Sequence, residues 1–183
     1  ETTDVLLLDL SQCLADFSTD ESIVTTMAYA LQRAGARLLD LDSRELGVLM
    51  ARTGTNGLSY GAVLYDNVPG GVGHVLELMN LGRTWLDEAR KVLYVDEAHH
   101  KHCDTACLQC LLSFEAQFAM SQNLLNRRLA YAVIDNLLDR TPLPEITRPN
   151  QTEIDSTSKA KTVKSVEERI KRAEGRQRRR RGK

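Results

Sequence analysis

The sequence lacks a long apolar run and lacks a signal peptide. No stretch approaches the roughly 18–20 apolar residues that a membrane-spanning helix needs. The basic start, apolar middle and small-residue cleavage site of a secreted protein are also missing. We therefore expect a soluble, cytoplasmic protein with no membrane partner. The chain starts at Glu1 rather than at a methionine, so we expect a fragment or a processed piece.

Prolines are few, and most of them lie in one place. Three of the four prolines fall within residues 140–158, among polar residues, which is typical of a linker. The formal net charge is only −1, yet residues 159–183 hold 12 Lys and Arg against 3 Asp and Glu. We therefore predict a folded domain over residues 1–139, a linker over 140–158, and a basic tail over 159–183 that is disordered or weakly helical.

A phosphate-binding loop is also missing, although one short string resembles a helicase motif. Residues 96–99 read Asp-Glu-Ala-His after an apolar run, as at the magnesium-binding strand end of a DEAH-type helicase. Nucleotide hydrolysis needs a loop of the form G-x-x-x-x-G-K-[ST] as well, and the chain contains none. We therefore do not interpret the string as an ATPase site. The alternative is a helix end with Asp96 and Glu97 in solvent.

The chain does contain a cluster of cysteines. Cys103, Cys107 and Cys110 lie within eight residues, whereas Cys13 is distant and is expected to be a buried small side chain. Two thiolates separated by two residues can turn toward one ion, so this knuckle spacing fits tetrahedral zinc. We therefore predict a zinc site, with three packed or surface thiols as the alternative.

The fourth ligand of such a site decides between a structural and a catalytic ion. His99, His100 and His102 come directly before the first cysteine. One of them would close a structural Cys₃His site, and we predict His100 for this role, with the other two as alternatives. A water molecule in that position would instead indicate catalysis and would need a general base nearby.

The apolar pattern predicts an α/β fold. Runs over residues 3–10, 44–52 and 60–66 indicate the strands of a small sheet. Ser18 lies three residues before Glu21, as in a capping box at the start of a helix, and more helical pattern follows later in the chain. We therefore expect a small sheet, several helices and a zinc knuckle between helices.

Three glycines, Gly70, Gly71 and Gly73, form the sharpest break in the chain. Backbone N–H groups at a helix start attract anions, which predicts an anion-binding turn where a DNA phosphate would sit. The alternative, which we favour, is a tight turn that lets a strand and a helix pack closely.

Several strings together resemble one known family. TDVLLL, VLYDNVPGGVGH, CDTACLQCLL and LLNRRLAYAVIDNLL follow one another over residues 3–139. In this order they resemble the MrfA-type zinc-binding domain, which occurs at the C-terminus of some superfamily-two DNA helicases and in DISARM-type phage-defence proteins. That family usually brings four cysteines to the ion. Here three match and the fourth is missing near Lys101, so a neighbouring histidine is the expected substitute.

The resemblance implies a zinc-bearing accessory module without catalysis of its own. We expect it to act in DNA repair or antiviral defence beside a helicase motor domain or subunit. The expected DNA contacts, unless they only lie on a solvated face, are Arg127, Arg128, Arg178, Arg179, Arg180 and Arg181. The alternatives are a zinc-dependent hydrolase or nuclease-like enzyme that uses Asp66, and a pure protein-interaction module.

Overall fold

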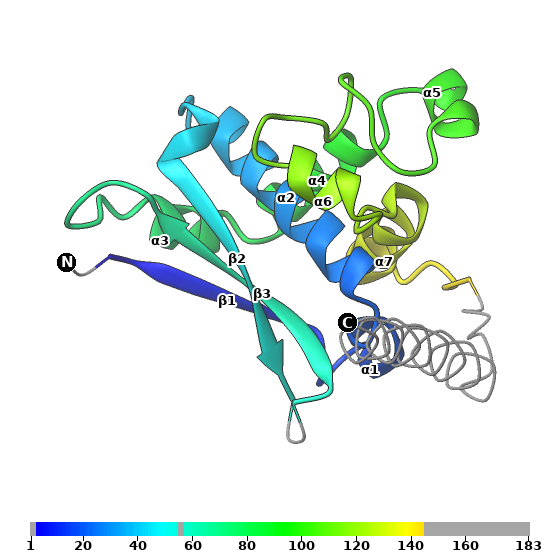
Figure 1. Cartoon of the computed structure of the whole chain (residues 1–183), viewed down its shortest axis with the longest axis horizontal. Coiled ribbons are helices and arrows are strands. Elements are labelled where there is room, and N and C mark those ends of the chain that lie inside the picture. The colour runs from blue at the N-terminus through cyan, green and yellow to red at the C-terminus, as the bar shows by residue number, and fades with distance from the viewer. Residues whose placement is uncertain (1–2, 55–56, 145–183) are drawn as a thin grey trace, which may run out of the picture. The chain divides into compact units, whose positions relative to one another are not determined.

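A computed structural model describes residues 3–54 and 57–144 of the chain (Figure 1). The expected α/β class is confirmed, because the described residues combine a small sheet with several helices. The predicted tail and most of the predicted linker lie outside the described residues, so the domain boundaries stay a prediction. In chain order the elements are β1 (Val5–Asp9), α1 (Ala15–Ser18), α2 (Glu21–Leu38), the short 3₁₀ helix η1 (Ser43–Glu45), β2 (Leu46–Thr53), β3 (Ser59–Asp66), α3 (His74–Leu81), α4 (Arg83–Leu93), α5 (Glu97–His102), α6 (Gln117–Ser121) and α7 (Arg127–Asp139).

The sheet has three strands, in the places where the apolar runs predicted them. Their order is β1-β3-β2, and both pairs are antiparallel. Across the sheet, Leu8 pairs with Ala62, and Ala62 pairs with Met50. Because side chains alternate along a strand, this register sets one face of the sheet toward the core.

The two faces of the sheet differ in burial. On the inner face, Ala62 and Leu64 of β3 are fully buried. On the outer face, Val5, Leu7 and Leu49 keep more than half of their surface exposed. An antiparallel sheet with one solvated face is common, so this arrangement is compatible with a stable domain.

Helix α2 is the central element of the core. It packs against β2 and β3 on one side and against α4 and α7 on the other, and Figure 1 shows it crossing the sheet. Ile23, Met27 and Leu31 are buried, as expected of a helix that contacts neighbours on several sides. Gly35 permits a close approach of α3, because a Cβ there would lie 2.6 Å from Leu78.

The start of α2 differs from the prediction. Ser18 ends the short helix α1, and its hydroxyl donates to the carbonyl of Ala15. The N-cap is Asp20, whose carboxylate accepts from the backbone N–H of Ser22 at 2.9 Å. Aspartate and serine are both good N-caps, and spacing alone did not distinguish the two.

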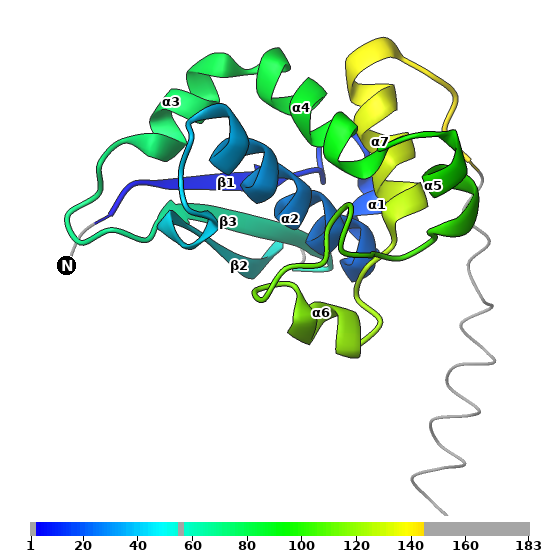
Figure 2. The ribbon, with the colours of Figure 1, turned by 90° about the horizontal axis from the view of Figure 1, so that it is seen from above.

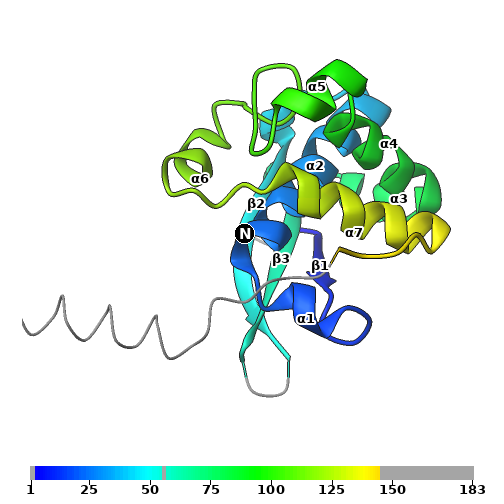
Figure 3. The same ribbon diagram turned by 90° about the vertical axis from the view of Figure 1, so that its right-hand side faces the viewer.

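Helices α4 and α7 cover the side of α2 that faces away from the sheet. In Figures 2 and 3, α3 and α4 lie on one side of α2 and α6 lies on the other. Arg90 joins α4 to α7 through the carboxylates of Asp135 and Asp139. Within the part of the chain that the structure describes, no helix has the length and apolarity to cross a membrane.

Candidate metal centre

The Asp-Glu-Ala-His string forms the beginning of α5. Asp96 is the N-cap, and its carboxylate accepts from the backbone N–H of His99 at 2.7 Å. Glu97 is exposed and pairs with Lys101 one turn later. The prediction of a helix end with both acids in solvent is therefore confirmed. The capping bond also orients the first turn of α5, which carries His99.

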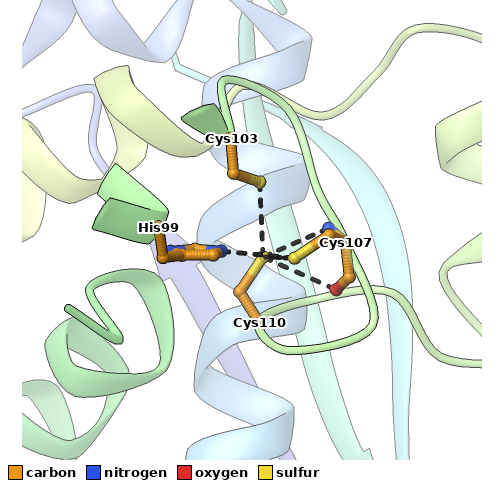
Figure 4. Close-up of side chains that lie close together, drawn as sticks. All are labelled: His99, Cys103, Cys107 and Cys110. Carbon is orange, nitrogen blue, oxygen red and sulfur yellow. Dashed lines mark hydrogen bonds between the residues drawn. The ribbon is translucent and has the colours of Figure 1, made fainter. Parts of the chain in front are cut away.

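Four side chains converge beyond this helix (Figure 4). His99, Cys103, Cys107 and Cys110 offer ligand atoms that all lie within 4.8 Å of one another. The Sγ of Cys110 lies 3.9 Å from that of Cys103 and 3.7 Å from that of Cys107. The Nε2 of His99 lies 3.2 Å from the Sγ of Cys107. We refer to residues 99–110 as the metal loop.

These separations fit a tetrahedral zinc ion. A Zn–S bond of about 2.3 Å at tetrahedral angles implies sulfur atoms about 3.8 Å apart, and both sulfur separations lie close to that. The expected nitrogen-to-sulfur separation is about 3.5 Å, so His99 lies slightly closer than a loaded site requires. Three thiols and one imidazole are also a donor set that zinc favours.

The structure corrects the predicted fourth ligand from His100 to His99. His99 and Cys103 are four residues apart, so both project from the same side of α5. His100 is turned away by one residue and packs between Tyr94 and Tyr131, with ring centroids at 4.9 and 5.5 Å. His102 is exposed and lies outside the cluster. The spacing of four residues was the sequence signal that identifies His99.

The cysteines are held in a compact turn. The N–H of Cys110 donates to the carbonyl of Cys107 at 3.1 Å. In return, the N–H of Cys107 donates to the Sγ of Cys110 at 3.2 Å. Cys110 is completely buried, whereas Cys13 is exposed and distant from the cluster. The expectation that Cys13 is buried was therefore wrong.

Burial and neighbouring groups act on the ionisation of two of the thiols, those of Cys103 and Cys107. Burial, together with the charge of Cys110, raises the pKa of Cys103 to about 12. Burial also opposes ionisation of Cys107, but the backbone N–H groups of Gln109 and Cys110 outweigh it, so the pKa of Cys107 falls. Three adjacent thiolates repel one another unless a cation compensates them. A bound metal ion would supply that compensation.

The environment of His99 favours the neutral imidazole that binds metal. Burial lowers the pKa of His99, and the positive charge of Arg127 adds to this effect, while Asp96 opposes it. The ring directs Nε2 at the cysteines, which leaves Nδ1 for the proton. That Nδ1 is buried and has no hydrogen-bond partner among the described residues.

Arg127 does not lie where a DNA contact requires. Its side chain is completely buried, and its guanidinium donates to the backbone carbonyls of Leu93, His100 and Cys103. A phosphate cannot reach a group that is enclosed in this way. The prediction that Arg127 binds nucleic acid is therefore wrong, and its structural role had no signal in the sequence.

The other predicted DNA contacts have different outcomes. Arg128 is about half exposed and pairs with Asp104, while one of its Nη atoms donates to the carbonyl of Lys101. It stays a predicted contact. The four arginines of the tail lie outside the described residues: Arg178, Arg179, Arg180 and Arg181.

The glycine turn between β3 and α3 is closed by the chain's own carboxylate. Asp66 accepts four backbone N–H bonds, at 2.7–3.1 Å, from Val72, Gly73, His74 and Val75. Burial opposes its charge, yet these N–H groups outweigh burial and lower the pKa of Asp66. We refer to residues 66–75 as the Asp66 turn.

The turn is therefore the tight packing turn favoured from the sequence, and its N–H groups do not form the alternative anion site. The N–H of Gly73 is bound to Asp66, and the N–H of Gly71 donates to the carbonyl of Val68. The φ angles of Gly70, Gly71 and Gly73 lie between 68° and 92°, a range that favours glycine. An incoming phosphate would have to displace a buried carboxylate.

Comparison with known proteins agrees with this geometry. Residues 27–111 match the family model of the MrfA Zn-binding domain, which confirms the resemblance over a shorter range than residues 3–139. No curated protein and no solved structure matches the chain. The matched range contains all four members of the metal cluster. Residues 27–111 of this chain therefore match the MrfA Zn-binding domain family, and His99, Cys103, Cys107 and Cys110 within them are positioned to hold a zinc ion.

Proposed function

We propose that the chain is a non-catalytic zinc-bearing accessory module of a helicase-associated DNA-processing or phage-defence complex in the cytoplasm. The observation that carries the proposal is the complete set of four protein ligands inside a segment that matches a zinc-binding family. Four protein ligands leave no position for a reactive water, which is the usual arrangement of a structural ion.

The surroundings of the cluster also favour a structural ion. One hollow of about 260 Å³ adjoins the end of the metal loop and is lined by Tyr29, Gln32, Arg33, Ser43 and residues 111–113. No metal ligand lines it. Asp66, the base considered for an enzyme, has its oxygens occupied by four backbone N–H groups. A general base needs a free lone pair near its substrate.

The charge distribution supports a contact with DNA through residues 159–183 rather than through the described residues. The described residues hold 18 Asp and Glu against 11 Lys and Arg, and an acidic surface repels phosphate. Residues 159–183 carry the excess of positive charge. We therefore assign DNA binding to this segment, with Arg128 as the candidate contact on the folded part.

DNA binding is tested by fluorescence anisotropy with labelled single- and double-stranded DNA. We compare the full chain with a variant in which Arg178, Arg179, Arg180 and Arg181 are all changed to glutamine. The expected result is weaker binding and a salt dependence reduced by about one for each arginine that contacts phosphate. Arg128→Gln serves as the comparison on the folded part. Affinity that is absent, or equal in all forms, would favour the protein-interaction module.

The helicase association is tested separately. The chain is mixed with a purified superfamily-two helicase motor, and DNA-stimulated ATP hydrolysis and strand separation are followed. We expect a change in either rate that requires the zinc-loaded chain. A rate that is identical with and without the chain would contradict the association. Cleavage of the DNA by the zinc-loaded chain alone, lost in Cys110→Ser, would support the enzyme alternative instead.

A further inference from the structure

The largest fully buried side chain of the described residues belongs to Arg127, at the start of α7. No carboxylate lies within ion-pair distance of its guanidinium in the part of the chain that the structure describes. Burying an unpaired charge is costly, so a buried arginine needs dense hydrogen bonding and a compensating negative charge. Its partners therefore indicate what the residue does.

The guanidinium binds the ends of two helices. Its Nη1 donates to the carbonyl of Leu93, the last residue of α4, at 2.6 Å. Its Nε donates to the carbonyl of Cys103 at 2.6 Å, and its Nη2 donates to that of His100 at 3.1 Å. Carbonyls at helix C-termini carry partial negative charge, which stabilises a cation.

The same residue also holds the start of the metal loop through its backbone. The N–H of Arg127 donates to the carbonyl of Asp104 at 3.1 Å. Residues on both sides of Cys103 are thus fixed against α7, and α5 is the element that presents His99 and Cys103 together. A residue from outside the metal loop therefore sets the position of two of the four ligands.

The charge of the loaded site supplies the missing compensation. A zinc ion with three thiolates and one neutral imidazole has a net charge of −1, and Arg127 carries +1. We propose that Arg127 is the positioning residue and the internal counter-charge of the metal centre, so that zinc binding and the docking of α7 stabilise each other. This inference uses only the zinc site and does not depend on the proposed roles with DNA or a helicase.

Coupling of this kind is reciprocal. If the docked guanidinium raises zinc affinity, then zinc must strengthen the docking of α7 by the same factor. The adjacent Arg128 offers a control, because it carries the same charge and also contacts the metal loop, at Lys101 and Asp104, but is about half exposed and binds no carbonyl of a metal ligand. If the net charge of the chain alone determined zinc affinity, Arg127→Gln and Arg128→Gln would change it equally.

The first experiment measures zinc affinity of the full chain by competition with a coloured chelator. Arg127→Gln is expected to lower the affinity by about tenfold or more, as is typical when a group that orients a metal ligand is removed. Arg127→Lys keeps the charge but loses the planar fork, so we expect an intermediate value. Arg128→Gln is expected to stay within about twofold of the parent. Equal affinities for the Arg127 and Arg128 variants would overturn the proposal.

The second experiment needs no variant and applies even if Arg127→Gln fails to fold. Hydrogen exchange of the unaltered chain is compared with zinc bound and after zinc is removed by a chelator. We expect the amides of residues 129–133 in α7 to lose protection together with the metal loop, while β3 keeps its protection. Unchanged protection in α7 after zinc removal would contradict the coupling.

Discussion

The Asp66 turn and the metal loop differ in how their crowded polar groups are compensated. Each gathers polar groups of one sign in a tight, partly buried turn. In the Asp66 turn four backbone N–H groups face one carboxylate of the same chain. In the metal loop three thiols and an imidazole face one another, and among the described residues their ligand atoms form hydrogen bonds only within the loop itself. The first turn is complete by itself, whereas the second requires a bound ion.

This difference distinguishes a turn that serves packing from a turn that binds a ligand. A turn that satisfies its own polar groups has no capacity left for a ligand, even when its glycine pattern resembles an anion site. A cluster whose members repel one another as ions indicates the ligand that it needs, because a bound cation offsets the repulsion of three adjacent thiolates. The predictions below therefore alter one turn and use the other as the reference.

The largest effect is expected from a change in a buried cysteine. Cys110→Ser should abolish stoichiometric zinc and destabilise the domain by roughly 4 kcal/mol or more, since loss of a structural metal is among the most damaging changes. Metal analysis and denaturant unfolding measure this. Cys13→Ser is the matched control, because Cys13 is exposed and distant, and it should change neither quantity. Full zinc retention by Cys110→Ser would show that Cys110 is not a ligand of the ion.

The next effect distinguishes the neighbouring histidines. His99→Ala should weaken zinc binding by well over about tenfold, because even partners outside the ligand set contribute that much. His100→Ala should keep the zinc and lose only packing against Tyr94 and Tyr131. His99→Cys should restore tight binding, since four cysteines form a donor set that zinc favours. Chelator competition measures all three, and a larger loss in His100→Ala than in His99→Ala would reverse the assignment.

A change in the Asp66 turn should lower stability without touching the metal. Asp66→Ala leaves four buried or half-buried N–H groups without their acceptor, which we expect to cost roughly 2–4 kcal/mol. Zinc stoichiometry should stay at one. The exposed carboxylate of Glu77, also near the start of α3, provides the control through Glu77→Gln. If Asp66→Ala also removed the zinc, the two turns would not be independent.

Acid should reduce the stabilising effect of Asp66. Its pKa is lowered in the folded chain, so its contribution is present above the ordinary aspartate pKa of about 3.9 and is lost as the pH falls through the folded pKa. Unfolding free energies of the parent and of Asp66→Asn are compared from about pH 8 down to about pH 3, which spans the ordinary pKa values of histidine and aspartate. The difference between the two unfolding free energies should become smaller only below about pH 4. A gap that narrows near pH 6.5 would point to a histidine instead.

Much of the fold was predictable because burial leaves a periodic trace. Alternation along β3 and the helical spacing of Ile23, Met27 and Leu31 both follow from the face that meets the core. The three cysteines were predictable for a related reason, since their spacing is a local property of one turn. Each of these features is encoded by residues that are close together in the sequence.

The features that were missed depend on orientation or on distant contacts. The adjacent histidines differ in orientation, because the phase of the short helix α5 relative to Cys103 points His99, and not His100, at the cysteines. Arg127 was interpreted as a surface cation, because nothing near it in the sequence indicates that α4 and α5 end against it. The Asp66 turn presents glycines in the sequence, whereas the carboxylate that fills the turn lies several residues earlier.

X-ray absorption spectroscopy at the zinc edge, on the purified full chain after its metal content is determined, is the most direct test of the metal site. The structure predicts one zinc ion per chain, bound by three sulfur atoms at about 2.3 Å and one imidazole nitrogen at about 2.0 Å. That nitrogen signal should disappear in His99→Cys and persist in His100→Ala. A chain without stoichiometric zinc, or a site with three sulfurs and a water oxygen, would contradict a closed structural centre.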